Sequence, residues 1–322
     1  MAGACPPALS IAVAKGGGLA ACGAVAMTPA ELLAWADEVR PHGAFQINLW
    51  IPSPAPVRDA AHEQRVRDFL AGFGPAVPAT AGDSVLQDFD AQCEAMLAAK
   101  PAIASSIMGV FPPVFVARLK AARILWLANA TTVGEALAAE AAGADLIVAQ
   151  GMEAGGHRGA FDATLAERDQ VGLFALLPAI VDAVCLPVIA AGAIADPRTI
   201  AAALLLGASA VSIGTGFLRC PEADAAWSSL FASARPEDTV LTRAFSGRPG
   251  RSIATRYVQA GGPVAPYPVQ RGLTAAMRAE ATRSGDPQRM QAWAGQAAAR
   301  APVEPAASLV ERWWREARAL LG

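Results

Sequence analysis

The sequence is poor in charged residues and rich in apolar ones. Of its 322 residues only 17% are charged and 54% are hydrophobic, and the formal net charge is −2. A chain this apolar can bury a large core, which excludes intrinsic disorder. It has no run of lysine or arginine, so we expect no nucleic-acid partner.

Cysteine is scarce, and its five copies are scattered. They are odd in number and form no Cys-x-x-Cys pair. This pattern predicts reduced thiols in a cytoplasmic protein, rather than a disulfide framework or a zinc site. No basic group accompanies Cys22 or Cys220, so we expect both thiols to be inert. Because His, Asp and Glu do not cluster at metal-ligand spacing, we expect no metal.

The N-terminus lacks the basic-then-apolar order of a secretory signal. The longest nearly uncharged run, residues 200–218, has the length of a membrane span, but Gly207 divides it. A helix that begins at Asp196-Pro197, followed by a buried strand over residues 209–214, explains this run better. We therefore expect no membrane partner.

What the chain does contain is a repeated order of apolar strand and helix. Runs rich in valine, isoleucine and leucine predict buried parallel strands, and capping boxes at Thr28 and at Thr132, each followed by a glutamate three residues on, predict helix starts. The predicted strands cover residues 18–25, 45–51, 102–108, 123–129, 146–150, 187–191 and 210–214. This order predicts right-handed βαβ units and an α/β fold, a TIM-type (β/α)8 barrel.

Seven strands are one fewer than the eight of a closed barrel. Residues 1–3 have the character of a loop after a strand, because two prolines and an apolar helix over residues 8–14 follow them. We therefore expect the first strand to be missing, either because the true start lies upstream of Met1 or because the chain is a natural truncation.

The strand–helix rhythm stops after Phe217. We expect a barrel over residues 1–220 and a smaller, mainly helical domain over residues 221–295 that lies over the barrel mouth. Residues 296–322 should return to the barrel through an amphipathic helix over residues 305–321. The tryptophans near the end, Trp293, Trp313 and Trp314, are expected in the core.

Glycine-containing turns follow the last two predicted strands, at residues 190–193 and 213–216. Barrels of this type often bind phosphate at these strand ends, where glycine lets backbone N–H groups approach closely and Thr215 adds a hydroxyl. The turns therefore indicate a phosphate site. The alternative is that these glycines only permit tight turns.

The clearest chemical signal is the loop AQGMEAGGHRG at residues 149–159. Four glycines, a glutamine, a glutamate and a histidine are a poor composition for packing. Gln150 offers a donor and an acceptor to a heterocycle. His157 is the candidate general base because its ordinary pKa lies near neutral pH. We interpret the other two histidines, His42 and His62, as structural.

This loop, with PVIAAG at residues 187–192 and SAVSIGTGFL at residues 209–218, resembles the nitronate monooxygenase family, formerly called 2-nitropropane dioxygenases. These are FMN-dependent barrel enzymes. The resemblance extends over nearly the whole chain. Its other segments are MAG at 1–3, which resembles the end of the family's first-strand motif, FQINL at 45–49, SGRP at 246–249, YP at 267–268 and WAGQ at 293–296.

The resemblance implies FMN as cofactor and His157 as the catalytic base above the flavin. The implied reaction is oxidation of alkyl nitronates, such as propionate 3-nitronate, by dioxygen to a carbonyl compound and nitrite. The residues that the resemblance places on the flavin or its phosphate are Met1, Asn48, Gln150, Gly155, Gly156, Gly192, Ala193, Gly214 and Thr215.

Several positions depart from the family's pattern. Ala193 stands where members often have glycine. Ile107 lies at about the place of a second histidine in close relatives, and Arg271 and Ala275 stand where those relatives have a tyrosine and a lysine. We therefore expect a rebuilt substrate pocket that includes Ile107, Tyr267 and Arg271.

Two alternatives remain open from the sequence. An FMN-dependent NAD(P)H reductase of enoyl thioesters or quinones, as in sister groups, would use the same barrel. A flavin-binding barrel without turnover would explain the missing strand, although the intact His157 loop argues against it. Arg248 and Arg251 either receive an anionic substrate or line a solvated loop. The sequence leaves the oligomeric state open.

Overall fold

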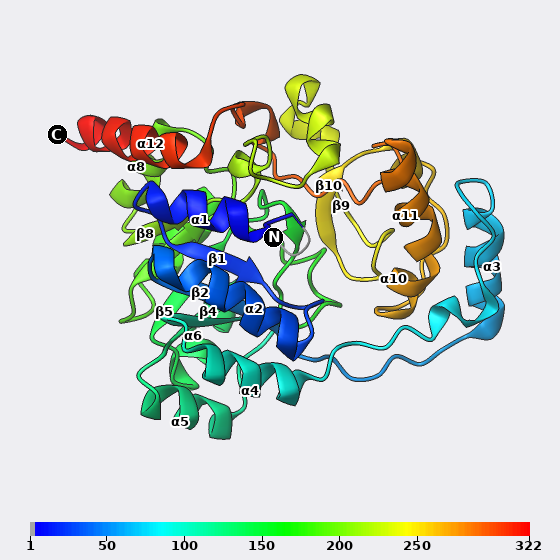
Figure 1. Ribbon diagram of the computed structural model, residues 1–322, viewed down its shortest axis with the longest axis horizontal. Helices are drawn as coiled ribbons and strands as arrows, with labels where there is room; N and C mark the ends of the chain where they lie inside the picture. Colours follow the sequence, from blue (N-terminus) through cyan, green and yellow to red (C-terminus); the bar gives the residue numbers. More distant parts are fainter. Residues whose placement is uncertain (1–3) are drawn as a thin grey trace.

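Seven parallel strands form one curved sheet in the order β1-β2-β3-β4-β5-β7-β8. In this computed structural model, which describes residues 4–322, helices cover the sheet's outer face (Figure 1). Every strand overlaps a predicted range, and the predicted TIM-type barrel architecture is confirmed. The strands are β1 (Ala20–Gly23), β2 (Phe45–Trp50), β3 (Ile103–Ile107), β4 (Leu125–Ala130), β5 (Leu146–Gln150), β7 (Val188–Ala191) and β8 (Ala210–Ser212). The expectation for Met1 lies outside the described residues.

The helices around the sheet follow the predicted alternation. They are α1 (Pro7–Lys15), α2 (Pro29–Val39), α4 (Phe89–Ala99), α5 (Pro113–Ala121), α6 (Val133–Ala141), α7 (Leu173–Val181), α8 (Pro197–Leu205) and α12 (Ala306–Leu321). Short 3-10 turns complete the chain: η1 (Arg40–His42), η2 (Ala79–Gly82), η3 (Thr215–Phe217), η4 (Ala226–Ser233), η5 (Pro236–Asp238) and η6 (Ala298–Arg300).

One predicted capping box is complete and the other is not. At the start of α2, Thr28 Oγ1 accepts from the Glu31 N–H, and the Glu31 carboxylate accepts from the Thr28 N–H at 2.8 Å. At α6 only the first half forms, because the Glu135 carboxylate accepts from the Thr131 N–H and from the Phe161 N–H instead. The prediction of a full box at Thr132 is therefore wrong. Glu135 joins the end of β4 to the loop after His157.

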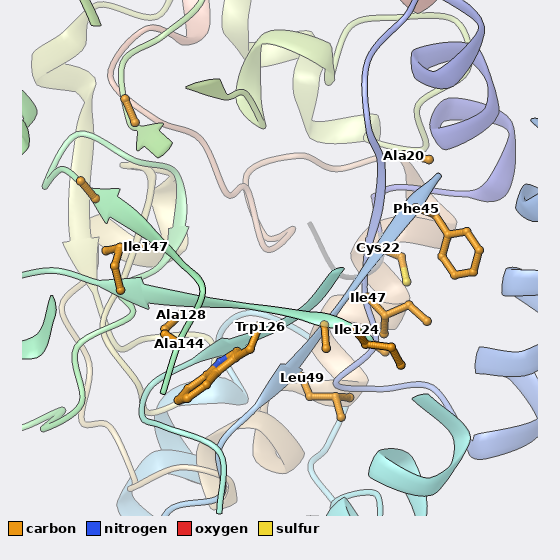
Figure 2. Packing of buried hydrophobic residues seen from close by; sticks show 14 of the residues in the cluster. Ala20, Cys22, Phe45, Ile47, Leu49, Ile124, Trp126, Ala128, Ala144 and Ile147 are labelled. Atoms are coloured by element: carbon orange, nitrogen blue, oxygen red, sulfur yellow. The ribbon is translucent and has the colours of Figure 1, made fainter. Parts of the chain in front are cut away.

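The core lies between the sheet and its helices. Strand β2 shows why: Phe45, Ile47 and Leu49 point to one face and are buried, whereas Gln46, Asn48 and Trp50 point to the other. Figure 2 shows Ile47 and Leu49 among the buried side chains of this outer layer, with Trp126 of β4. Each large apolar side chain buried in this way contributes about 1.5–3 kcal/mol. The polar residues of β2, Gln46 and Asn48, therefore lie on the inner face of the sheet.

A second group of elements lies beside the sheet. It contains α9 (Arg256–Gln259), α10 (Val269–Leu273) and α11 (Ala275–Ser284), and also a three-stranded antiparallel sheet of β6 (Gly156–His157), β10 (Gly250–Ile253) and β9 (Thr239–Thr242). The sequence did not reveal this small sheet. Helix α3 (Ala60–Leu70), from the long connection after β2, lies next to α10 and α11 (Figure 1).

One apolar cluster unites these distant segments. Val66 and Leu70 of α3 pack with Phe245, Tyr257 and residues of α10 and α11. The residue boundaries of the three expected parts stay predictions.

Helix α12 returns to the barrel, where it packs against α8 and α1. Leu309 and Trp313 are buried on its inner side, whereas Trp314 is 52% exposed. The expectation of a core position is therefore confirmed for Trp313 and wrong for Trp314. Across residues 4–322, each helix is too short or too polar to cross a bilayer. Burial raises the pKa of the Cys22 and Cys220 thiols to about 12, so both stay protonated at neutral pH.

Candidate active site

His157 lies on β6, where it pairs with Gly250 of β10. Its imidazole ring meets two tryptophans edge-on, with centroid distances of 4.6 Å to Trp50 and 4.8 Å to Trp293. Trp50 ends β2 on the inner face of the main sheet. Trp293 belongs to the segment that follows α11 in the chain. The ring is thus held between the barrel and the elements that cover it.

Ser246 fixes the ring through a hydrogen bond that the sequence analysis did not anticipate. Its Oγ lies 2.8 Å from His157 Nε2 and accepts from the Arg248 N–H at 3.3 Å. Ser246 is fully buried, at 1% exposure. In the sequence this serine stands out only as part of the SGRP segment. The adjoining Gly247, with φ of 87°, is the local signal for a tight turn that could have drawn attention to it.

The surroundings of His157 keep its imidazole neutral. Burial, together with the positive charges of Arg248 and Arg271, lowers the pKa of His157 to about 3. A neutral imidazole can accept a proton, which is the first requirement of a general base. An anion bound among these residues would offset the two positive charges and raise the pKa of His157 towards its ordinary range.

Arg248 is buried rather than solvated, at 4% exposure. Its guanidinium lies 5.8 Å from the centre of the Tyr267 ring, and its Nη1 donates to Ser53 Oγ at 2.6 Å. Within residues 4–322 it forms no ion pair with a carboxylate, and its buried Nε lacks a hydrogen-bond partner. A buried, uncompensated guanidinium is costly unless an anion completes the site. The alternative of a solvated loop is therefore wrong for Arg248.

Arg251 is also buried, but it has a structural role. Its Nε donates to the Met152 carbonyl at 2.8 Å, and its Nη1 donates to the Thr239 carbonyl at 3.2 Å. These bonds tie the loop after β5 to the small sheet. The side chain is thereby committed to acceptors within the chain, including Thr239 Oγ1 at 3.1 Å, and the solvated-loop alternative is wrong here too.

Gln150 and Arg158 shape the loop that carries His157. Gln150 Oε1 accepts from the Gly159 N–H at 2.8 Å, and its Nε2 donates to the His157 carbonyl at 3.2 Å. Arg158 Nη1 donates to the Gln150 carbonyl at 2.6 Å. Gln150 therefore positions His157 and keeps one amide hydrogen for a ligand. Its contact with a flavin stays a prediction.

The inner face of the sheet carries polar side chains where a closed barrel would have an apolar filling. Asn48 and Gln46 both donate to Ser105 Oγ, at 2.8 and 2.9 Å. Asn129, at the end of β4, is buried and its Nδ2 has no hydrogen-bond partner among the described residues. Such amides and hydroxyls suit the edge of a planar heterocycle, which presents donors and acceptors of its own. The residues present therefore fit a flavin ring.

The two glycine-containing turns come together at the ends of neighbouring strands β7 and β8. Gly192 and Ala193 both have positive φ, at 122° and 52°. The left-handed backbone at Ala193 explains why glycine would be favoured there. Thr215 Oγ1 accepts from the Gly295 N–H at 3.0 Å, and its hydroxyl hydrogen remains able to donate to an anion. This arrangement fits a phosphate.

Gly155 lies very close to two other segments of the chain, at Gly295 and Thr215. A Cβ on this residue would lie 2.4 Å from Gly295 N and 2.8 Å from Thr215 Oγ1. Gly156 has φ of 81° and open space around it. Gly155 therefore lets the loop after β5 pack on the turn that holds Thr215.

The predicted pocket residues lie around His157. Ile107 pairs with Trp50 across β3 and β2, and it lies against Gly159. Tyr267 has its ring centre 5.9 Å from that of Trp50. Arg271 lies on α10, close enough for its charge to act on His157 and on Tyr267. The other two histidines make other contacts: His42 is exposed, and His62 Nε2 forms a hydrogen bond with the Val264 carbonyl.

The curved parallel sheet, with a histidine and polar side chains gathered at its inner side, is the architecture of a barrel enzyme. The chain belongs to the nitronate monooxygenase family, whose model matches residues 1–315. This membership supports a flavin cofactor.

Curated relatives and solved structures agree with this assignment. A nitronate monooxygenase of Paraburkholderia phytofirmans is 41% identical, over 98% of this chain and 90% of that protein. A probable nitronate monooxygenase of Staphylococcus aureus is 34% identical, over 96% and 90%. A nitroalkane oxidase structure from Streptomyces ansochromogenes has a TM-score of 0.90 at 35% identity, covering 99% and 95%. FabK from Thermotoga maritima is similar at a TM-score of 0.73 and 27% identity, covering 100% and 91%.

Proposed function

We propose that this protein oxidises alkyl nitronates, such as propionate 3-nitronate, with dioxygen to a carbonyl compound and nitrite, using FMN. The observation that carries the proposal is the pairing of a neutral His157 with the buried, unpaired Arg248. A nitronate is an anion, so it supplies the charge that this guanidinium lacks. The family and the similarity to a nitroalkane oxidase support the same reaction.

FMN would lie against the inner face of the sheet, with its phosphate at the ends of β7 and β8. When bound, it supplies the electron transfer that protein side chains cannot. Asn48, Gln150 and Asn129 would face the ring, beside the loop of Gly155 and Gly156. The phosphate ligands would be Gly192, Ala193, Gly214 and Thr215.

The residues of the chain prepare the substrate. With a neutral nitroalkane, the His157 imidazole accepts the proton from the carbon that carries the nitro group, and the hydrogen bond to Ser246 at Nε2 fixes the ring while it does so. Arg248 stabilises the negative charge that develops on the nitro oxygens. Trp50, Trp293 and Tyr267 exclude water from this region. The free cysteines support a reducing compartment such as the cytoplasm.

The test is oxygen consumption together with nitrite formation by the purified flavoprotein. A pre-formed nitronate should drive both, and NADH with an enoyl thioester or a quinone should drive neither turnover nor flavin reduction. The similarity to FabK is the observation that favours the alternative, an NAD(P)H-dependent reductase. NADH-dependent reduction of those acceptors, without nitrite from any nitronate, would replace the proposal by this alternative.

A further inference from the structure

The Ser246 hydroxyl has three hydrogen-bonding neighbours. Its Oγ lies 2.8 Å from His157 Nε2, 3.3 Å from the backbone nitrogen of Arg248 and 3.3 Å from the carbonyl oxygen of Arg248. A serine hydroxyl has one hydrogen to donate and two lone pairs that accept. All three contacts can therefore form together only if one neighbour accepts and the other two donate.

Two of these neighbours have a fixed role. The Arg248 N–H can only donate, and the Arg248 carbonyl can only accept. His157 Nε2 donates if it carries the hydrogen of the neutral ring, and it accepts if the hydrogen is on Nδ1. The position of the ring hydrogen therefore decides where the serine hydrogen goes.

With the ring hydrogen on Nε2, every contact is satisfied. Nε2–H and the Arg248 N–H both donate to Ser246 Oγ, and the serine hydrogen goes to the Arg248 carbonyl. This carbonyl needs the donor, because Arg248 is buried and its carbonyl oxygen accepts no other hydrogen bond within residues 4–322. The second ring nitrogen of His157, Nδ1, then keeps a free lone pair.

With the ring hydrogen on Nδ1, two groups lose or lack a partner. The serine hydrogen would go to Nε2, so the buried Arg248 carbonyl would lose its donor. The Nδ1–H would have no acceptor, since no hydrogen-bond partner of Nδ1 lies in the described part of the chain. A buried polar group without a partner is costly. The surroundings of His157 therefore favour the hydrogen on Nε2.

Backbone contacts on both sides of Ser246 hold it in place. The Phe245 carbonyl accepts from Thr274 Oγ1 at 2.7 Å, and the Gly247 N–H donates to the Arg243 carbonyl at 2.8 Å. Ser246 itself is buried. The turn between β9 and β10 therefore fixes the position of the Oγ.

We infer that Ser246 is a positioning residue that keeps the ring hydrogen of His157 on Nε2, so that Nδ1 is the atom that accepts the substrate proton. This inference rests on the proposed function and deepens it by naming the atom. The C–H bond of the neutral nitroalkane breaks and its electron pair forms the C=N bond of the nitronate, whose negative charge lies on the nitro oxygens. The proton forms a new bond to Nδ1.

The contact with Ser246 needs no change when His157 takes up this proton. Both ring nitrogens of the imidazolium donate, and Nε2–H keeps Ser246 Oγ as its acceptor. In the opposite tautomer, the lone pair of Nε2 would be occupied by the serine hydrogen. The hydroxyl would then have to turn away before the ring could accept a proton.

The first test determines the tautomer in the wild-type flavoprotein by NMR of nitrogen-15-labelled histidine at alkaline pH. A ring nitrogen that carries hydrogen resonates far from one that does not, and the signals lost in His157→Asn identify His157. His62 is an internal reference. Its Nε2 lies 3.0 Å from the Val264 carbonyl, which can only accept, so its neutral ring carries the hydrogen on Nε2.

His157 should show the same pattern as His62, with the hydrogen on Nε2. A neutral His157 with its hydrogen on Nδ1 would overturn the inference. Because this measurement needs no variant of Ser246, it does not depend on whether such a variant folds.

The second test replaces Ser246. In Ser246→Ala the ratio of the Nε2–H form to the Nδ1–H form of His157 should fall by about tenfold, the effect of one hydrogen bond, and Ser246→Thr should restore it. The matched control is Ser106→Ala. Ser106 is also buried, accepts from Trp126 Nε1 at 3.0 Å and donates to the Gly109 carbonyl at 3.1 Å. An unchanged ratio in Ser246→Ala would remove Ser246 from this role.

The kinetics of the same variants distinguish positioning from a general loss of structure. Ser246→Ala should lower kcat/KM for a neutral nitroalkane by about tenfold and that for the pre-formed nitronate by less than about twofold, because only the first substrate needs a proton acceptor. Ser106→Ala should change neither. Equal losses on both substrate forms in Ser246→Ala would contradict the inference.

These tests separate the inference from the proposed function. A ring hydrogen on Nε2 in a protein that oxidises no nitronate would contradict the proposed function and leave the tautomer assignment standing. Oxidation of nitronates by a protein whose His157 carries its hydrogen on Nδ1 would contradict the inference and leave the proposed function standing.

Discussion

His157 depends on three kinds of neighbour. Trp50 and Trp293 hold the ring edge-on, and Ser246 binds its Nε2. Burial, together with two guanidinium groups, lowers the pKa of the ring and keeps it neutral. These neighbours come from several segments that lie far apart in the chain. The reactivity of this residue is therefore a property of its surroundings as much as of the imidazole itself.

Replacing His157 by asparagine tests its role as a base. We expect His157→Asn to lower turnover of neutral nitroalkanes by about 10²–10⁴, the usual contribution of a general base. Turnover of the pre-formed nitronate should fall less, since its proton is already gone. Steady-state oxygen consumption with both substrate forms measures the difference, and His42→Asn, at an exposed position, is the control. An equal loss on both forms would remove the base assignment.

The same residue predicts a pH dependence of stability. The pKa of His157 falls from 6.5 to about 3 on folding, so below pH 6.5 the unfolded chain binds a proton that the folded chain does not. Above about pH 6.5, His157 therefore does not lower the unfolding free energy. As the pH falls from 6.5 towards 3, the unfolding free energy decreases, because the unfolded chain takes up the proton first. Between pH 7 and pH 5, the unfolding free energy of the flavin-free wild type should fall by about 1–2 kcal/mol more than that of His157→Asn. Urea unfolding at both pH values measures this. An equal fall in unfolding free energy for the wild type and for His157→Asn would contradict it.

At the scale of elements, helix α12 supports the phosphate end of the site. Trp313 packs against Phe217 with the two rings tilted and their centroids 5.7 Å apart, and a Cβ on Gly216 would lie 2.9 Å from the Trp313 ring. Gly216 and Phe217 belong to η3, which begins with Thr215. The packing of α12 therefore fixes the position of the Thr215 hydroxyl.

Two adjacent tryptophans allow a matched comparison. Trp313→Ala should lower the free energy of unfolding by about 3–5 kcal/mol, because it leaves a cavity beneath η3. Trp314→Ala should cost less than about 1 kcal/mol, because that side chain is half exposed. Urea unfolding measures both, and flavin retention on gel filtration should fall only in Trp313→Ala. Equal stability losses would contradict this account of α12.

The elements of the main sheet could be predicted because their pattern is local. Strand β2 carries its apolar residues on the face that the helices cover, and α2 begins at a complete capping box. Strand β6 could not be predicted, since it is two residues long and its partner β10 lies far away in the sequence. A pattern that depends on a distant partner leaves no periodicity in the sequence.

The candidate site divides in the same way. The His157 loop and the turns at Ala193 and Thr215 could be found because each is a short segment of unusual composition. Ser246 and Trp293 could not be assigned to the site, because only the folded chain brings them to His157. The contact of Glu135 could not be predicted for the same reason. Its carboxylate accepts from the distant Phe161 N–H instead of completing the predicted capping box.

At the scale of the whole molecule, the second group of elements is anchored by residues from early in the chain. Helix α3 and the 3-10 turn η2 lie in the connection after β2 and pack with α10 (Figure 1). The covering elements are thus held on two sides, by the small sheet at β6 and by α3. The candidate active site lies where the two groups meet, because His157 contacts both Trp50 and Trp293.

A cofactor that binds across the barrel should stabilise the whole fold. FMN at a hundred times its dissociation constant should raise the unfolding free energy by about 2.7 kcal/mol. Riboflavin at the same concentration should stabilise the protein much less, because it cannot use the phosphate site at Gly192, Ala193, Gly214 and Thr215. Thermal unfolding of the flavin-free protein with each compound measures this, and equal shifts in Tm would contradict the phosphate assignment.

The central claim is that this flavoprotein takes electrons from nitronates. The most direct measurement is an anaerobic absorbance titration of the FMN-loaded protein with propionate 3-nitronate, and in a separate sample with NADH. We predict that the nitronate bleaches the flavin absorbance and that NADH leaves it unchanged. Bleaching by NADH alone would contradict the claim and assign the protein to the NAD(P)H-dependent reductases.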